Sequence, residues 1–342
     1  MPVFFPDATR AVIKTVDSED IKKTKTLGIL VNTFHLWREM NEGVLKKFGG
    51  ISPFMNWNGA VISDSGGFQV MSVIKSGEMK GKITDEGVVM YPSQNKKVVL
   101  TPEKSVAFQM KLMTDMVVVL DDFTTPDSTY DEAKESVQRT IAWAKRSKRE
   151  FEKISKKTGR KPYLLGVVQG GYFQDLRKYC TQELVKIGFD GLGYGGWPLN
   201  KDGTFDYKSA KTISDNSPKD YLLYGLGIGK PDEIVKLTKM GYGIFDCVLP
   251  TRDARHKRLY VFKSKSLKGK FYKYFTPDKS KYLKDTSKVS KHCDCLLCNN
   301  YSKAYLAHLF KNEPMAAMRL ATIHNLRFYS MLMEKVIKSV DK

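Results

Sequence analysis

The hydrophobic pattern of this 342-residue chain alternates short apolar runs with longer amphipathic segments. Each apolar run ends in a polar or glycine-rich turn, and each is followed by enough chain for a helix. The runs are Leu27–Val31, Ala60–Ile62, Met116–Leu120, Leu164–Val168, Phe189–Tyr194, Leu222–Leu226 and Gly243–Phe245. Helical spacing and charged faces predict helices at Asp131–Lys156, Gln174–Ile187 and Pro231–Met240.

Strands that are apolar on both faces are typical of a parallel sheet covered by helices. Seven such β-then-α units favour a closed (β/α)8 TIM barrel over an open doubly wound sheet. No Gly-x-Gly-x-x-Gly pattern follows an early strand, so a dinucleotide site is not predicted. We expect the barrel and its catalytic site in residues 1–260, with the final barrel helix within 300–342. Residues 261–342 should hold a basic segment, a zinc-binding subdomain and C-terminal helices.

The charge of the chain points to a polyanionic partner. The net charge is +20 with a pI near 9.5, and such a field favours nucleic acid first and an anionic membrane surface second. No apolar run approaches the roughly 18 residues of a membrane helix, and no signal-peptide pattern is present. We therefore expect a soluble cytoplasmic protein with no membrane association.

The basic excess is concentrated between Arg252 and Lys291, where lysines alternate with tyrosines and phenylalanines. Aromatic side chains among cations can stack on bases while the cations neutralise phosphates. They can equally be the inward face of a strand whose other face is solvated, and for the aromatics we favour this second interpretation.

The cysteines do not form a paired framework. Three of the five are packed into Cys293-x-Cys295-x2-Cys298, and His324 follows within an apolar-periodic helix. Three thiolates and one imidazole suit a closed tetrahedral zinc site, which leaves no open position and is therefore structural. His292 and His308 compete with His324 as the fourth ligand.

Several polar residues follow predicted strands directly. They are Asp64, Asp121, Gln169, Gly195, Gly196 and Asp246. In a barrel the C-terminal strand ends meet at one rim, so these residues should share a pocket. Two carboxylates, Asp64 and Asp246, can divide acid/base and nucleophilic work in glycosyl transfer. Asp121 offers two acceptors that match the N–H and NH₂ donors of guanine. Each residue alone is more often a strand-end cap or turn residue, and only their combination on one rim favours a binding site.

Five longer motifs carry a resemblance. They are Ser63–Ser72, Gly166–Gly170, Gly225–Asp232, Phe245–Arg255 and the Cys3His tail with Thr322–Tyr329. Together they resemble the tRNA-guanine transglycosylase family over nearly the whole chain. The resemblance implies a (β/α)8 barrel with a structural zinc. It also implies replacement of the wobble guanine of tRNA by a 7-deazaguanine, either preQ1 or queuine, in queuosine modification.

The resemblance also implies residue roles. Asp246 becomes the nucleophile that forms a covalent ribosyl-enzyme, and Asp64 becomes the general acid/base. The base-binding positions are Ser65, Gly66, Gly67, Phe68, Asp121, Gln169, Gly195, Gly196 and Tyr224. The positions for the tRNA backbone are Gly227, Gly229, Lys230, Thr251, Arg252 and Arg255. The zinc ligands that the resemblance implies are Cys293, Cys295, Cys298 and His324.

The partners implied are the tRNA anticodon stem-loop, guanine, a 7-deazaguanine base and a second copy of the chain, paired through the zinc region. Two alternatives stay open: a non-catalytic tRNA-binding subunit of a heterodimer, and base exchange on DNA. The presence of both Asp64 and Asp246 argues against the first.

The chain departs from the family pattern near the base. Phe123 stands where a small thiol is common, Tyr224 where a thioether is usual, and Trp197 and Pro198 replace small residues in Gly195–Lys201, which also lacks the usual glutamate. The early strand or hairpin that precedes Pro2–Pro6 in relatives is expected to be missing. These departures leave the incoming base open.

Overall fold

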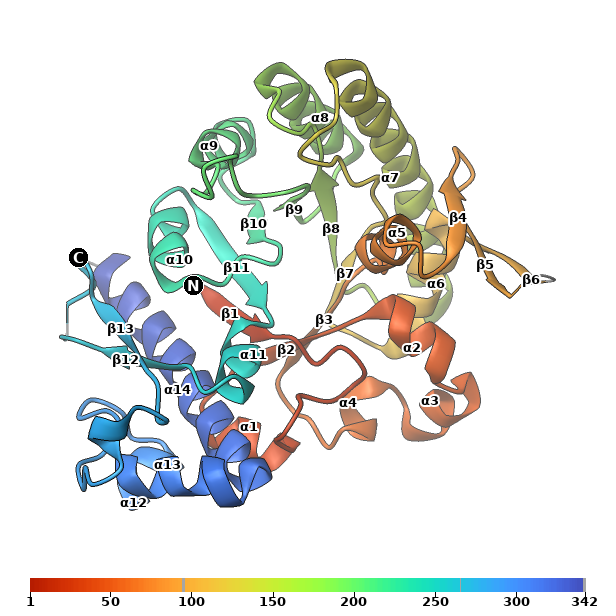
Figure 1. Cartoon of the computed structure of the whole chain (residues 1–342). Coiled ribbons are helices and arrows are strands. Elements are labelled where there is room, and N and C mark those ends of the chain that lie inside the picture. Colours follow the sequence, from red (N-terminus) through yellow and green to blue (C-terminus); the bar gives the residue numbers. More distant parts are fainter. Residues whose placement is uncertain (94–95, 265, 341–342) are drawn as a thin grey trace.

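A barrel of parallel strands forms the centre of this computed structural model, which describes residues 1–93, 96–264 and 266–340 (Figure 1). Its strands are β1 (Val3–Pro6), β2 (Gly28–Val31), β3 (Ala60–Ser63), β7 (Met116–Val118), β8 (Tyr163–Val168), β9 (Gly191–Tyr194), β10 (Leu222–Gly225) and β11 (Tyr242–Cys247). They are ordered β1-β11-β10-β9-β8-β7-β3-β2. The barrel closes where Asp7 bridges Leu30 and the Ala8 amide donates to the Leu30 carbonyl at 2.7 Å. The predicted TIM barrel and its seven predicted strands are confirmed.

The eighth strand, β1, was not predicted as a strand. It lies within Pro2–Pro6, and it pairs in parallel with β11, so that Phe5 lies opposite Asp246. On its outer side the Phe4 ring lies 4.4 Å from the ring of Tyr329. The first and the last parts of the chain are thus packed together.

Helices surround the barrel (Figure 1). They are α1 (Ser18–Lys23), α2 (Thr33–Glu39), α3 (Glu42–Phe48), α4 (Ile51–Phe54), α5 (Gly67–Lys75), α6 (Pro102–Leu112), α7 (Tyr130–Thr158), α8 (Gln174–Ile187), α9 (Tyr207–Asp215), α10 (Pro231–Thr238), α11 (Leu249–Arg255) and α14 (Pro314–Val340). The longest, α7, starts at a capping box of Thr129 and Glu132 and ends at Gly159 in the left-handed conformation. Within the described ranges, none of the helices has the length and apolarity to cross a membrane.

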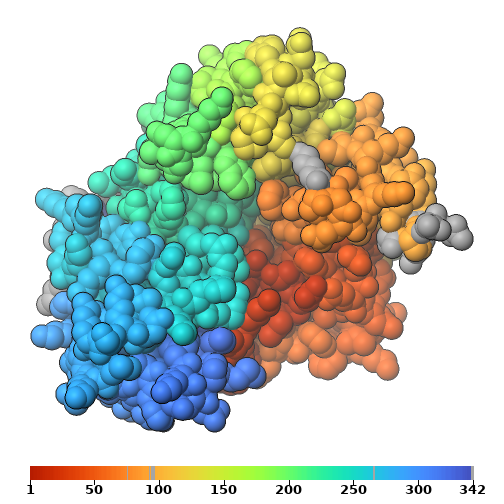
Figure 2. Space-filling view, viewed as in Figure 1, coloured from red at the N-terminus to blue at the C-terminus, as the bar shows by residue number. Residues whose placement is uncertain are grey.

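Two smaller sheets and a C-terminal layer complete the fold. The antiparallel strands β4 (Lys80–Ile83), β5 (Val88–Ser93) and β6 (Lys96–Leu100) project from one side, and β12 (Leu259–Phe262) pairs with β13 (Tyr272–Phe275). The 3₁₀ turn η1 (Ser280–Tyr282) and the helices α12 (Leu296–Asn300) and α13 (Lys303–Asn312) follow. α14 packs against α11, α12, α13, β12 and β1. Figure 2 shows these C-terminal residues (blue) adjoining the N-terminal residues (red). The domain boundary near residue 260 stays a prediction.

The barrel interior is filled by one apolar cluster. Its buried members are Phe5, Leu30, Ile62, Met116, Val118, Leu165, Val167, Tyr224 and Ile244. Side chains alternate between the two faces of a strand, so the residue two positions further on points the same way. At the C-terminal ends of five strands these next inward positions hold Asp7, Asn32, Asp64, Gln169 and Asp246. The alternation of the strands therefore places polar groups over the apolar core.

Candidate active site

Asp246 ends the inward face of β11 and is held by two donors. The Tyr224 hydroxyl donates to its Oδ1 at 2.6 Å, and the Gly227 amide donates to the same oxygen at 2.8 Å. The residue is only 8% exposed. Burial raises the pKa of Asp246 to about 6, although both hydrogen bonds lower it. Oδ1 is thus fixed, and among the described residues no donor contacts Oδ2.

Asp64 follows β3 and is fixed more tightly. Its Oδ1 accepts from the Thr33 amide at 2.9 Å and from the Gly66 amide at 3.0 Å, and its Oδ2 accepts from Asn32 Nδ2 at 2.5 Å. Burial raises the pKa of Asp64 to about 7 despite these bonds. A carboxyl with a pKa near neutrality can both give and take a proton at physiological pH. Asn32 and Thr33 were not among the predicted site residues.

Asp121 and Gln169 form a second pair across neighbouring strands. Gln169 is fully buried, its Nε2 donates to Asp121 Oδ2 at 2.5 Å, and its Oε1 accepts from the Thr124 amide at 3.1 Å. Burial raises the pKa of Asp121 to about 7. The free Asp121 oxygen and the amide of Gln169 are brought together as the sequence predicted.

The glycine pair after β9 permits a close approach of backbone to Gln169. A Cβ on Gly195 would lie 2.6 Å from Gln169 Nε2, and one on Gly196 would lie 3.2 Å from Gln169 Oε1. Gly196 also has φ +80°, which favours glycine. Behind the pair, the buried Arg177 donates from Nη1 to the carbonyls of Val168 and Gly195 at 2.8 and 2.7 Å. Arg177 is a positioning residue that the sequence did not indicate.

The turn after Asp64 carries an exposed aromatic side chain. Gly66 has φ +78° and is the N-cap of α5, which begins at Gly67. The Gly67 amide donates to Ser65 Oγ at 3.2 Å. The next residue, Phe68, is 47% exposed and meets the ring of Phe123 edge-on at 5.0 Å. Trp197, in the connection that follows β9, is 44% exposed. Large aromatic side chains therefore follow β3, β7 and β9 at this end of the barrel.

Several predicted residues have other contacts in the structure. Tyr224 is fully buried and holds Asp246, so its contact with a base stays a prediction. The Gly229 carbonyl accepts a hydrogen bond from the Tyr329 hydroxyl, and Lys230 forms an ion pair with Glu233 at 3.1 Å. Thr251 is buried and donates to the Val248 carbonyl. The RNA contacts of these last three residues stay predictions.

Arg252 and Arg255 lie together on α11, directly after β11. Arg252 is exposed, and Arg255 is half-buried. Burial, and then the nearby charge of Arg252, lower the pKa of Arg255. Within the described part of the chain neither guanidinium has an acidic partner. Two neighbouring unpaired guanidinium groups can hold a phosphate.

The four predicted zinc ligands form one buried cluster. The ligand atoms of Cys293, Cys295, Cys298 and His324 lie within 4.8 Å of one another. His324 Nδ1 is 3.5 Å from Cys295 Sγ and 3.3 Å from Cys298 Sγ, close to the ~3.6 Å edge of a tetrahedral zinc site. Its Nε2 donates to the Tyr260 carbonyl at 2.8 Å, which directs the Nδ1 lone pair at the sulfurs. The residues fit zinc, whereas His292 and His308 are exposed outside the cluster.

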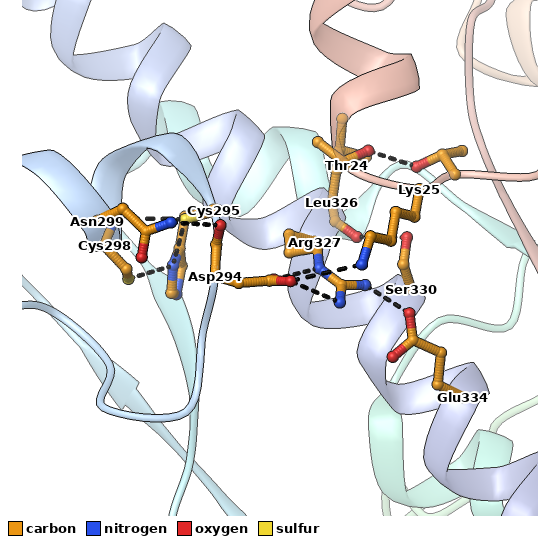
Figure 3. Close-up of polar contacts among 12 residues, drawn as sticks. Thr24, Lys25, Asp294, Cys295, Cys298, Asn299, Leu326, Arg327, Ser330 and Glu334 are labelled. Carbon is orange, nitrogen blue, oxygen red and sulfur yellow. Dashed lines mark hydrogen bonds and ion pairs between the residues drawn. The ribbon is translucent and has the colours of Figure 1, made fainter.

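The metal loop is also pinned to α14 by charge (Figure 3). Asp294, between two of the cysteines, accepts from Arg327 Nε and from Nη2, the latter at 3.1 Å, and lies 3.5 Å from Lys25 Nζ. Arg327 in turn donates to Glu334 at 2.7 Å. None of the five cysteines forms a disulfide.

The aromatic side chains of the basic segment are mostly inside. Tyr260, Phe262, Phe271 and Phe275 are buried, whereas Tyr274 is 46% exposed and lies under Arg258 at 5.1 Å. The predicted inward position is confirmed for these four aromatic side chains, but β12 is buried on both faces rather than solvated on one. An RNA contact of the segment would therefore come from its lysines.

Comparison with known proteins identifies similar chains. The family model described as queuine tRNA-ribosyltransferase matches residues 1–342. A protein of that name from Vibrio cholerae serotype O1 (strain M66-2) is 38% identical over 342 residues, which are all of this chain and 86% of the relative. One from Haemophilus influenzae (strain Rd) is 38% identical over 99% of this chain and 85% of the relative, and one from Mannheimia succiniciproducens is 37% identical over all of it.

Proposed function

Because the chain belongs to the queuine tRNA-ribosyltransferase family, we propose that it exchanges the wobble guanine of a tRNA anticodon for a 7-deazaguanine base. The observation that supports this most directly is the pair of buried carboxylates, Asp246 and Asp64, at the ends of two strands of one barrel. A base-recognition pair, Asp121 and Gln169, lies on the same rim. Basic side chains for the RNA backbone follow the nucleophile strand directly.

In the first step Asp246 attacks the ribose. Its free Oδ2 forms a bond to C1′ while the bond between C1′ and guanine N9 breaks, and the electron pair of that bond leaves with the purine. Asp64, whose raised pKa keeps a proton available near neutrality, protonates the departing guanine. The result is a covalent ribosyl-enzyme ester.

The second step reverses the first with another base. The incoming 7-deazaguanine loses its proton to Asp64 and attacks C1′, and Asp246 departs as a carboxylate. Two displacements at one carbon retain the configuration of the glycosidic bond. No external energy source is needed, because one N-glycosidic bond replaces another.

Asp121 and Gln169 read the purine edge. The Asp121 carboxylate accepts from the N–H and NH₂ groups of guanine, and the Gln169 and Gly196 amide groups donate to its carbonyl. Phe68 covers one face of the purine. Phe123 and Trp197 shape the wall that meets the 7-substituent. The target base must leave its stack, so a single-stranded anticodon loop is a less costly substrate than a duplex.

The proposal is tested by incorporation of labelled base. The protein is incubated with unmodified tRNA carrying a wobble guanine and with radiolabelled guanine, preQ1 or queuine, and label in the RNA is counted. Guanine must enter the RNA, and the better competing deazapurine identifies the incoming base. No incorporation with any base contradicts the proposal and directs the test to a heterodimeric partner or to DNA.

We expect a bell-shaped dependence of kcat/KM on pH for guanine exchange. Asp246 must be ionised to attack and Asp121 must be ionised to bind the purine edge, so the rate rises with pH through the raised pKa values of about 6 and about 7. Asp64 must hold a proton for the departing base, so the rate falls above a pKa of about 7. Initial rates between pH 4.5 and 9 measure both limbs. Asp64→Asn should remove the alkaline limb, and a rate independent of pH would contradict the assignment.

Replacing both Arg252 and Arg255 by alanine should weaken RNA binding at low salt. Each guanidinium lost removes about one phosphate contact, so the slope of log K against log[salt] should fall by ~0.7 per residue for a single-stranded loop. Titration of an anticodon stem-loop at several salt concentrations measures this. Lys211→Ala with Lys186→Ala, on distant exposed helix faces with their own acidic partners, is the control. An unchanged slope would move the RNA contact to the lysines of the basic segment.

We also propose a homodimer that pairs through the zinc region. Support comes from exposed aromatic and apolar side chains there, among them Tyr301, Tyr305 and Met315. Such side chains are enriched at protein interfaces. Sedimentation at micromolar concentration should give twice the mass of the chain, and a monomer alone would contradict the proposal.

A further inference from the structure

A third carboxylate, Asp7, lies on the catalytic rim, where neither the motifs nor the proposed chemistry accounts for it. It follows β1, whose Phe5 belongs to the apolar interior of the barrel, so Asp7 two residues later points inward as well. The register sets Phe5 opposite Asp246 on one side. On the other side Asp7 bridges Leu30 of β2, two residues before Asn32. Asp7 is therefore flanked by the strand of Asp246 on one side and by the strand of Asn32, which holds Asp64, on the other.

The backbone fixes Asp7 in this place. The Ala8 amide donates to the Leu30 carbonyl at 2.7 Å, and the Asn32 amide donates to the Thr9 carbonyl at 3.1 Å. Thr9 Oγ1 donates to Asp7 Oδ1 at 2.8 Å. A carboxylate has about four lone-pair positions, so further donors can be accommodated. The side chain is thus oriented before any substrate binds.

The electrostatics agree with a central position. Burial is the largest cause of the raised pKa of both Asp64 and Asp246, and the charge of Asp7 raises each of them further. Asp7 itself is partly buried, and that burial raises its own pKa. An acid that interacts with both catalytic carboxyls lies within reach of a substrate held between them.

The order of strands around the barrel shows which part of a nucleoside meets Asp7. The base-recognition residues follow β7, β8 and β9, whereas β1 and β2 lie on the opposite side of the closed barrel. Around the barrel, β3 with Asp64 lies between β7 and β2, and β11 with Asp246 lies between β10 and β1. The two carboxylates therefore lie between the base-recognition side and the side of β1 and β2. With the purine over β7 to β9 and C1′ at Asp246, the ribose extends over β1. Asp7 therefore faces sugar and not base.

We propose that Asp7 accepts a hydrogen bond from the 2′-hydroxyl of the target nucleotide and so selects RNA over DNA. Within a nucleic acid chain the 3′ and 5′ oxygens of the ribose are esterified, so the 2′-hydroxyl is its only free donor. This hydroxyl distinguishes RNA from DNA. A hydrogen bond to the hydroxyl beside the reacting carbon also strengthens as positive charge develops on the sugar. The inference rests on the proposed base exchange.

The test compares two anticodon stem-loops that differ in one atom. One carries guanosine and the other 2′-deoxyguanosine at the exchanged position, and kcat/KM for radiolabelled guanine exchange is measured on both. A deoxyribose glycosidic bond breaks more readily by itself, so the informative quantity is the ribo/deoxy ratio of wild type divided by that of a variant. For Asp7→Val this quotient should be about 10 or more, the size of a charge-assisted hydrogen bond. Asp7→Asn, nearly the same shape, keeps an acceptor and should give a smaller quotient.

Two controls separate the possible outcomes. A deoxynucleotide at the neighbouring position should give a quotient of about 1, and so should the exposed variant Asp220→Asn on the original pair. A quotient of about 1 for both Asp7→Val and Asp7→Asn would overturn the proposal even if both variants are slow, because a merely structural role does not depend on one substrate hydroxyl. If Asp7→Val does not fold by circular dichroism, Asp7→Ala, which also lacks an acceptor, takes its place. Absence of exchange by wild type on the ribo substrate would instead overturn the base exchange itself.

Discussion

Asp246→Asn is expected to abolish guanine exchange while leaving RNA binding intact. The amide keeps the shape of the side chain and can still accept from Tyr224 and Gly227, but it lacks the charge needed to attack C1′. Removal of a covalent nucleophile costs on the order of 10³-fold or more in kcat. Label counted in tRNA after incubation with radiolabelled guanine measures the loss, and filter binding measures the affinity for the RNA.

A covalent intermediate gives a second measurement for the same variant. Wild-type protein incubated with tRNA in the absence of a free base should give an adduct that survives denaturing electrophoresis, and Asp246→Asn should give none. Asp220→Asn changes an exposed carboxylate ahead of β10 and should retain both exchange and adduct. Exchange at the wild-type rate by Asp246→Asn would show that another group attacks the ribose.

Cys295→Ser is expected to remove the metal and to destabilise the protein strongly. The four ligand atoms are buried within 4.8 Å of one another. Without a metal ion, three thiols and an imidazole would be crowded together with no cation to balance thiolate charge, which destabilises the folded state. A structural zinc contributes its binding free energy to folding. We expect the melting temperature to fall by about 10 °C or more, measured by circular dichroism alongside metal content by mass spectrometry.

Chelation of the wild-type protein should reproduce the effect of the substitution. His308→Gln, on the exposed face of α13, is the matched control and should keep one zinc per chain and the wild-type melting temperature. A chelated protein that melts unchanged would mean that hydrogen bonds alone hold the cluster together.

The sequence was sufficient for the strands whose patterns are local. Runs such as Leu164–Val168 are apolar on both faces and are followed by an amphipathic helix, so each predicts its own β-then-α unit. β1 lacks this signal because it ends in Pro6 and is followed by no long amphipathic helix. Its partner β11 begins at Tyr242. A strand that is defined by pairing with a partner so distant in the sequence leaves no hydrophobic periodicity in its own short stretch of chain.

The same distinction holds for the site. Asp64 and Asp246 could be predicted because the ends of parallel strands meet at one rim, whichever residues lie between them. Arg177 could not, because an arginine inside α8 has the pattern of a solvated helix face. Its burial depends on where the turns after β8 and β9 bring their carbonyl groups. Asp7 was missed for the reason that β1 was missed.

Helix α14 links the metal to the chemistry. It carries His324 of the cluster, the Asn325 amide donates to the carbonyls of Pro250 in α11 and of Arg258 beyond it, and the Tyr329 hydroxyl donates to the Gly229 carbonyl. Gly229 lies two residues after Gly227, whose amide holds Asp246. During synthesis α14 leaves the ribosome after every barrel strand. A nascent chain can therefore form much of its barrel before α14 is present to hold α11 and the loop that follows β10. Acquisition of the ion and onset of activity should coincide as late events in biogenesis, so that incomplete chains do not act on tRNA.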